Sequence, residues 1–541
     1  LLRCPRRLGA GSLPLICGLL LAAAPQLLFE GQDLSLGLSV MGKAPHQSVA
    51  NTSPGPIGEI AIFERPAKAL LMGSQGMAPM LEYSAEPTWA RGVLSHLWWI
   101  ALLLAAARGA WRSRQSLVDL VRRQLDRARQ KIRDGGTAPS AGDVADGVSG
   151  ELRSMTEPAP RQVINATGVI IHTNLGRAPL SPAAIEAMTQ AARGYTDLEM
   201  DLSTGRRGSR QAHLQSLLQQ VTGAEGALAV NNNASAILLG LSALSVGKEV
   251  IVSRAEAVEI GGGFRIPDVL KQSGAKLIDV GTTNRTYLRD YEDAITENTA
   301  ALLKVHTSNF RVEGFTAEVE PSELVALSKE KGIPVLHDVG SGALLPTEAY
   351  GLAHEPTPQE SIAAGVGLVF FSGDKLLGGP QSGMVVGTSE LVRRLERHPL
   401  ARAIRIDKMS LAGLTATLLH YLKQEAESEI PIWRMISAGE QEIKDRAERW
   451  KSQLALPGEV ISSKSAVGGG SLPGETLPTW VLALSCEGSA GGPEAVMRNL
   501  REAKPPVIAR IEDDRVILDP RTVLPEEEDS LLTALRDAIS P

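Results

Sequence analysis

The sequence has few cysteines and no long hydrophobic run, and both features limit the classes of protein to which it can belong. Only three cysteines occur, Cys4, Cys17 and Cys486, and none has the spacing of a disulfide framework or a zinc site. Residues 13–29 are apolar but interrupted by prolines, and residues 94–107 are too short to span a bilayer. We therefore expect no bound metal, no membrane partner and a reducing, cytoplasmic location.

The chain also lacks a strong charge of one sign, since 55 basic and 61 acidic residues give a net charge of −6. A polyanionic partner would therefore have to bind a local patch. Residues 108–136 form such a patch, with nine Lys or Arg and three Asp. Within it, residues 115–133 repeat apolar side chains at helical spacing. This pattern predicts a helix whose basic face binds a phosphate backbone such as that of RNA, and a merely solvated face is the alternative.

Composition and periodicity divide the chain into four parts. Residues 1–79 are rich in Gly, Pro and Ser and begin with Leu, so we expect a poorly structured extension that is not native to the fold; a secretory signal is the alternative. Residues 80–150 are expected to be helical and to end in a Gly- and Ala-rich linker over 137–150. Residues 151–425 predict a large α/β domain, and residues 426–541 predict a smaller α+β domain.

Short apolar runs alternate with helical patterns in the large domain. These runs lack the alternation of a half-exposed strand, which indicates a largely parallel sheet covered by helices on both faces. The expected strands are 226–230, 250–253, 276–280, 301–305, 333–338, 366–371 and 384–386. Ligands of such sheets bind at the carboxyl ends of the strands.

Three polar features follow the ends of these strands, in an informative order. Asn231 to Ser235 begin a helix, where free N–H groups suit a phosphate. Asp338 ends a second run and could hold a proton on a pyridine nitrogen, and Lys375 follows a third run. A desolvated lysine amine condenses with an aldehyde, although Lys375 alone is also typical of a surface loop. Together the three features predict a fold-type-I enzyme that uses pyridoxal phosphate (PLP).

Two arginines that follow Lys375 in the sequence are candidates for binding an anion. Arg402 and Arg405 are three residues apart, so they share a face if this segment is helical. On one face they would clamp an oxyanion in bidentate fashion. Surface salt bridges are the alternative interpretation.

Six motifs resemble one family, the bacterial selenocysteine synthases, which are L-seryl-tRNA(Sec) selenium transferases. The resemblance extends from about residue 115 to residue 532. The motifs are Ile164–Leu180 (INATGVIIHTNLGRAPL), Glu259–Asp268 (EIGGGFRIPD), Val280–Arg285 (VGTTNR), Lys304–Asn309 (KVHTSN), Ser372–Gln381 (SGDKLLGGPQ) and Pro506–Ile511 (PVIARI).

This resemblance implies an aspartate-aminotransferase-like α/β fold in which Lys375 holds PLP and Asp338 pairs with the ring nitrogen. The other positions implied to bind the cofactor are Asn232, Asn233, Ser235 and Ser372. The positions implied to line the pocket of the selenium donor are Arg177, Asn309, Asp374, Arg402 and Arg405.

The resemblance also implies a reaction and partners. L-seryl-tRNA(Sec) would become L-selenocysteinyl-tRNA(Sec), with selenophosphate as donor and with loss of the β-hydroxyl through an aminoacrylyl intermediate. Lys375, once displaced from PLP, would remove the Cα proton. The family further implies a tRNA-binding domain within residues 80–150 and a homo-oligomer built as a ring of dimers.

Two other functions fit the same residues. One is a PLP-dependent lyase or transferase that acts on a free small amino acid without tRNA. The other is a non-catalytic RNA-binding scaffold, against which the presence of Lys375, Asp338 and the arginines argues. The fold alone does not choose among them.

Overall fold

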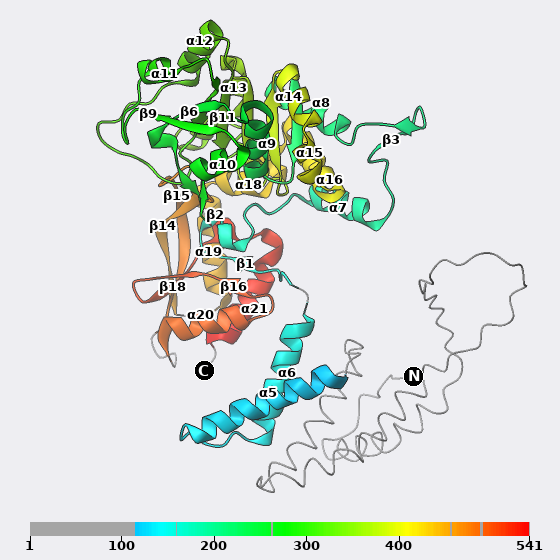
Figure 1. The fold of residues 1–541 in the computed structure, drawn as a ribbon. Coiled ribbons are helices and arrows are strands. Elements are labelled where there is room, and N and C mark those ends of the chain that lie inside the picture. The colour runs from blue at the N-terminus through cyan, green and yellow to red at the C-terminus, as the bar shows by residue number, and fades with distance from the viewer. Residues whose placement is uncertain (1–113, 158, 261–262, 455–456, 487–490, 540–541) are drawn as a thin grey trace, which may run out of the picture. The chain divides into compact units, whose positions relative to one another are not determined.

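The computed structural model describes residues 114–157, 159–260, 263–454, 457–486 and 491–539 (Figure 1). The chain divides into two compact units, residues 1–157 and residues 158–541. The expected extension over residues 1–79 and the apolar segment 94–107 lie outside the described residues. No described helix is both long and apolar enough to cross a membrane.

In the first unit, the described residues form two packed helices, α5 (Arg114–Arg133) and α6 (Ala141–Thr156). Their shared core contains Leu120, Leu125, Val144, Val148 and Leu152. The expected helix over 115–133 is confirmed, but the expected linker over 137–150 is wrong because most of it belongs to α6. A Ser140–Asp143 capping box begins α6, and its apolar residues four apart face α5.

The second unit is built on a seven-stranded sheet whose strand order is β5-β13-β12-β11-β10-β6-β9. The strands are β5 (Gly226–Val230), β6 (Glu249–Ser253), β9 (Lys276–Val280), β10 (Thr299–Val305), β11 (Val335–Gly340), β12 (Leu368–Ser372) and β13 (Gly383–Gly387). Only β13 runs antiparallel to its neighbours within this sheet. The prediction of a largely parallel sheet made of these seven runs is confirmed.

Helices cover both faces of this sheet, as Figure 1 shows. Along β12, Leu368 and Phe370 enter one core while Val369 and Phe371 enter the other. The first core is completed by α9 (Asn233–Ser245), α10 (Ile266–Ser273) and α14 (Ser389–Arg397). The second is completed by α8 (Ala212–Thr222), α11 (Leu288–Ala294), α12 (Pro321–Lys331), α13 (Pro358–Ala364) and α16 (Lys408–Leu422). Burial on both faces explains why these strands are continuously apolar.

A smaller sheet, in the order β17-β18-β15-β14-β2, forms the C-terminal part of the same unit. Its strands are β2 (Val169–Ile171), β14 (Gly458–Gly468), β15 (Thr476–Ser485), β17 (Arg510–Glu512) and β18 (Arg515–Leu518), and its helices are α19 (Glu440–Leu454), α20 (Gly492–Glu502) and α21 (Glu528–Ile539). Strand β2 pairs in parallel with β14, far away in sequence. The segment around β2 therefore belongs to the small sheet of the C-terminal α+β part, although the sequence predicted it in the large domain over 151–425.

The remaining elements are short and mostly connect these layers. A parallel pair joins β1 (Ile164–Asn165) to β16 (Val507–Ile508). The others are α7 (Pro182–Arg193), α15 (Pro399–Ala403), α17 (Ala426–Glu429), α18 (Pro431–Ser437), β3 (Met200–Asp201), β4 (Arg206–Arg207), β7 (Glu259–Ile260) and β8 (Phe264–Arg265).

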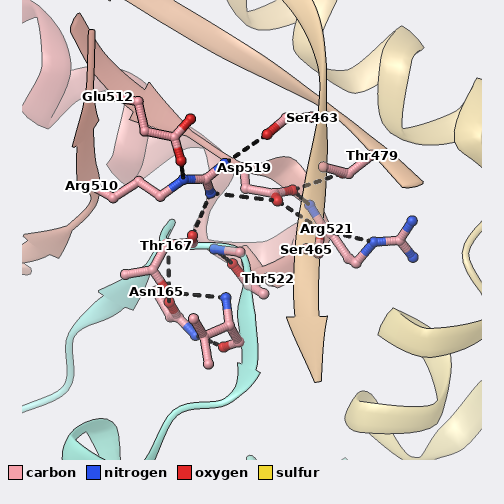
Figure 2. Close-up of polar contacts among 12 residues, drawn as sticks. Asn165, Thr167, Ser463, Ser465, Thr479, Arg510, Glu512, Asp519, Arg521 and Thr522 are labelled. Atoms are coloured by element: carbon pink, nitrogen blue, oxygen red, sulfur yellow. Dashed lines mark hydrogen bonds and ion pairs between the residues drawn. The ribbon is translucent and has the colours of Figure 1, made fainter. Parts of the chain in front are cut away.

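A buried polar network anchors β2 to the small sheet (Figure 2). The carboxylate of Asp519, which is fully buried, accepts hydrogen bonds from Ser465 Oγ at 2.7 Å and Thr479 Oγ1 at 3.0 Å. It also accepts from the backbone N–H of Arg521 at 3.0 Å, and the guanidinium of Arg510 lies 3.8 Å away. Arg510 in turn donates to the carbonyl of Thr167. Since Thr167 lies two residues before β2, the network fixes the chain at the start of this strand.

Replacing Asp519 by alanine should destabilise the protein strongly. Arg510 and three hydrogen-bond donors would lose a buried carboxylate, a change that costs about 3–5 kcal/mol when one member of a buried ion pair is removed. Urea denaturation would measure the loss, with Glu512→Ala as the matched control. Glu512 also binds Arg510, but its side chain is half exposed, so its loss should cost less than about 1 kcal/mol. Equal midpoints for the two variants would contradict this role of Asp519.

Candidate active site

Lys375 lies in a buried turn directly after β12. Its side chain is 6% exposed, and its Nζ is 3.5 Å from the carbonyl oxygen of Gly470. The turn requires Gly373, because a Cβ there would lie 2.1 Å from Ser382 Oγ and 2.7 Å from the Pro380 carbonyl. Burial lowers the pKa of Lys375, which favours the neutral, nucleophilic amine.

Asp338 lies on β11, the strand beside β12, at the position opposite Phe370. The residue is 3% exposed, and its carboxylate accepts hydrogen bonds from Asn233 Nδ2 at 2.9 Å and from the Gly340 backbone N–H at 3.1 Å. Burial raises the pKa of Asp338, while Asn233 and the nearby Lys375 charge act in the opposite direction. Asp338 is therefore a desolvated acid within electrostatic reach of Lys375.

The N-terminus of α9 forms the third part of the site. The side chain of Asn232 caps the helix by accepting from the Ser235 N–H at 2.9 Å. Strand β13 approaches this turn so closely that a Cβ on Gly383 would lie 2.2 Å from the Asn232 carbonyl oxygen. Ser372 is paired with Gly383 across the sheet, so it lies at the same edge. Helix N-termini with free N–H groups bind phosphates.

These residues fit the three functional groups of PLP. Lys375 suits the aldehyde, Asp338 suits the ring nitrogen, and the α9 N-terminus suits the phosphate. The contact between Asn233 and Asp338 joins the helix N-terminus to the acid, and Asn233 Oδ1 is buried without a hydrogen-bond partner. Hence the structure gathers all six of the predicted cofactor-binding positions at one edge of the sheet.

Two of the predicted donor-binding residues also meet at Lys375. Arg177 Nη1 binds Asp374 Oδ2 at 2.8 Å, and the Ala178 N–H donates to the carbonyl oxygen of Asp374 at 3.2 Å. Arg177 has φ of +70°, an uncommon conformation for a residue with a side chain. After burial, the Arg177 charge is a further cause of the lowered Lys375 pKa.

The other three donor-binding candidates are less closely gathered. Arg405 is not on a helical face with Arg402, because α15 ends at Ala403 and Arg405 forms a β-bridge with Val230. That bridge brings the Arg405 backbone to the end of β5, next to the helix N-terminus. Its side chain is 44% exposed and 3.9 Å from Glu199. Asn309 is exposed, and its Nδ2 donates to the Glu259 carbonyl oxygen at 2.8 Å.

Sequence reasoning missed the residues that close the site from the other side. Gly470 belongs to the turn between β14 and β15, in which Gly468, Gly469 and Gly470 have φ of +77°, +67° and +72°. Such conformations suit glycine, so the three consecutive glycines were a readable signal. His306 and Glu355 line a cleft of about 290 Å³ together with Leu472, and the Glu355 charge acts on Lys375. They lie in loops, and nothing in their local pattern marked them.

Comparisons with known proteins agree on one family. Residues 163–524 match the family described as L-seryl-tRNA selenium transferase. The L-seryl-tRNA(Sec) selenium transferase of Moorella thermoacetica is 49% identical over 431 residues, which cover 78% of this chain and 91% of that protein. The protein of that name from Carboxydothermus hydrogenoformans is 51% identical over 384 residues, covering 70% and 82%.

A solved structure shares the fold at low sequence identity. D-glucosaminate-6-phosphate ammonia-lyase is similar with a TM-score of 0.51 and 19% identity, over 72% of this chain and 98% of that one. Together with the strand order, this confirms the predicted α/β fold of the type I transferases.

Replacing Arg177 by glutamine should shift the titration of Lys375. The Arg177 cation lowers the pKa of the lysine, so its removal, which also leaves Asp374 unpaired, should raise that pKa. The neutral amine would then form only at higher pH. Borohydride trapping of the lysine adduct with PLP, followed across pH, should show a higher midpoint than in the wild type.

Arg254→Gln is the control for this titration, since Arg254 pairs with Asp279 at an exposed site. It should leave the midpoint unchanged. A midpoint that moves downward in Arg177→Gln would show that Arg177 does not act on the amine as described.

Proposed function

The chain belongs to the L-seryl-tRNA selenium transferase family, and we propose that Lys375 carries its conversion of L-seryl-tRNA(Sec) to L-selenocysteinyl-tRNA(Sec). The protein is thus a PLP-dependent transferase. The observation that supports the role of Lys375 is its buried amine, within electrostatic reach of a buried carboxylate and beside a helix N-terminus. We propose selenophosphate as the selenium donor.

Each residue of the site has a distinct part in this function. PLP, when bound, supplies an aldehyde for the lysine amine and a ring that accepts electron density from the substrate Cα. Asp338 would hold a proton at the ring nitrogen, and its burial strengthens that interaction. Asn232, Asn233, Ser235 and Ser372 would bind the phosphate. Lys375, after the seryl amine displaces it, would remove the proton from Cα.

The donor would bind on the side of Lys375 that Arg177 occupies. Selenophosphate is a phosphate-like anion, for which planar guanidinium groups are well suited. Arg177 and Asp374 are already joined beside the lysine, and the Arg405 backbone lies at the end of β5. We assign Arg402, Arg405 and Asn309 to the outer wall of this pocket, where their exposure leaves them accessible to the donor.

The tRNA would bind the basic face of α5. Glu151 of α6 pairs with Arg123 and Arg127, while Arg122 and Arg133 are exposed. A cytoplasmic homo-oligomer, a ring of dimers, is the proposed assembly. Tyr195, Met200 and Leu202 have exposed apolar side chains, which supports a contact between subunits at residues 195–202.

Replacing Lys375 by alanine should abolish selenium transfer. No other described group lies where it could replace the amine, so transfer from selenophosphate to seryl-tRNA(Sec) should fall by at least about 10²-fold. Radiolabelled selenium in the aminoacyl-tRNA is the measurement. Lys423→Ala, at an exposed lysine paired with Glu425, is the control and should retain full activity. Equal turnover by wild type and Lys375→Ala would reject the assignment.

The competing function, action on a free small amino acid, is tested by charge changes on α5. In the double variant Arg122→Gln and Arg133→Gln, affinity for seryl-tRNA(Sec) should fall, and the slope of log affinity against log salt should decrease by about 1 for each lost phosphate contact. Arg501→Gln, at an exposed arginine of α20, is the control. Activity on free serine, with no effect of the α5 changes on tRNA, would favour the competing function.

A further inference from the structure

A carboxylate whose charge acts on Lys375 and an imidazole whose charge acts on Asp338 have no part in the function proposed so far. Glu355 is 1% exposed, and its Oε1 is 3.8 Å from Nδ1 of His306. Both of these atoms are buried, and neither has a hydrogen-bond partner. Buried polar atoms are rarely left in this state, because an unmade hydrogen bond costs free energy. Each of the two atoms could satisfy the other, since one is a nitrogen and the other a carboxylate oxygen.

The loops that carry the pair also contact the residues around Lys375 and Asp338. The second carboxylate oxygen of Glu355 accepts from the Leu472 N–H at 3.4 Å, in the turn whose Gly470 contacts Lys375. The backbone N–H of His306 donates to the carbonyl oxygen of Asp338 at 2.8 Å. Glu355 therefore contacts the turn that reaches Lys375, and His306 lies next to Asp338 at the end of the neighbouring strand β10.

The orientation of the imidazole leaves one nitrogen for a ligand. Nδ1 is buried toward Glu355, yet 22% of the His306 side chain is exposed, and the residue lines the cleft. A rotation that closes the gap by about 1 Å would give an Nδ1–H···O bond of ordinary length. The carboxylate would then stabilise the protonated ring and present Nε2 to the cleft, as in other carboxylate–histidine pairs.

The proposed reaction needs a proton donor in addition to Lys375. Hydroxide is a poor leaving group, so the seryl oxygen must be protonated as its bond to Cβ breaks. Lys375 is already assigned to remove the Cα proton. Resting on that proposed function, we propose that His306, oriented by Glu355, protonates the departing β-hydroxyl group.

The step balances without another reactant. The Cα proton goes to Lys375, and the electrons of that C–H bond form the Cα=Cβ bond. The Cβ–O bond breaks with both electrons on oxygen, the oxygen takes the proton from His306 Nε2, and water leaves. His306 recovers a proton from solvent through the open cleft. His306 is therefore a catalytic acid, and Glu355 is a positioning residue.

Substrates with different leaving groups test this step in the full-length, PLP-loaded enzyme. Seryl-tRNA(Sec) needs a proton on its leaving group, whereas β-chloroalanyl-tRNA(Sec) releases chloride without one. His306→Gln should slow selenium transfer to the seryl substrate by at least about 10²-fold and to the chloroalanyl substrate by less than about threefold. Glu355→Gln should lower kcat for the seryl substrate with little change in KM. It should slow transfer to the chloroalanyl substrate much less.

His354→Gln is the matched control, because His354 lines the same cleft but pairs with Glu348 and Glu360. It should leave both rates unchanged. PLP affinity, measured by absorbance titration, should be the same in all three variants and the wild type, which separates a lost acid from a damaged site.

Equal slowing of both substrates by His306→Gln, or no slowing of either, would overturn the proposal, because the effect of His306 would then not depend on whether the leaving group needs a proton. Either outcome leaves the proposed function intact if the wild type uses seryl-tRNA(Sec). Failure of the wild type itself on that substrate would overturn the proposed function and this inference together.

Discussion

The whole site depends on keeping a lysine amine and a carboxylate out of water. Burial disfavours both charges, so it lowers the pKa of Lys375 and raises that of Asp338. Each residue is restrained by its neighbours, Asp338 by Asn233 and Gly340 and Lys375 by the carbonyl of Gly470. A desolvated amine reacts with an aldehyde more readily than a hydrated ammonium does, so the cost of burial is also the source of reactivity.

Sheet topology explains how these groups meet although they are far apart in sequence. The parallel strands β10, β11 and β12 end at the same edge, where His306, Asp338 and Lys375 follow one another across the sheet. β13 is antiparallel and enters from that edge, so Gly383 can touch the Asn232 turn. The small sheet adds Gly470, and through β2 it places the loop that carries Arg177.

The sequence predicted those parts of the site that depend on local pattern. The strands before Asn232, Asp338 and Lys375 are buried on both faces, so their uninterrupted apolar runs were easy to recognise. α6 was missed because its Gly, Ala and Ser content is typical of a linker, although Ser140 and Asp143 form a capping box. The pairing of β2 with β14 joins segments almost 300 residues apart and has no local signal.

The site residues that the sequence did not predict lie in loops, where their surroundings depend on tertiary contacts. Arg402 and Arg405 would have shared a face only in a helix, but Arg405 forms a β-bridge to Val230, a tertiary contact that their spacing does not reveal. Glu355 and His306 acquire their environment only when the loops after β10 and β11 meet the turn containing Leu472. A carboxylate that is 1% exposed with an unpaired oxygen is costly for stability alone. Such a cost is most readily understood where the unpaired atoms take part in chemistry, and here their charges act on Lys375 and Asp338.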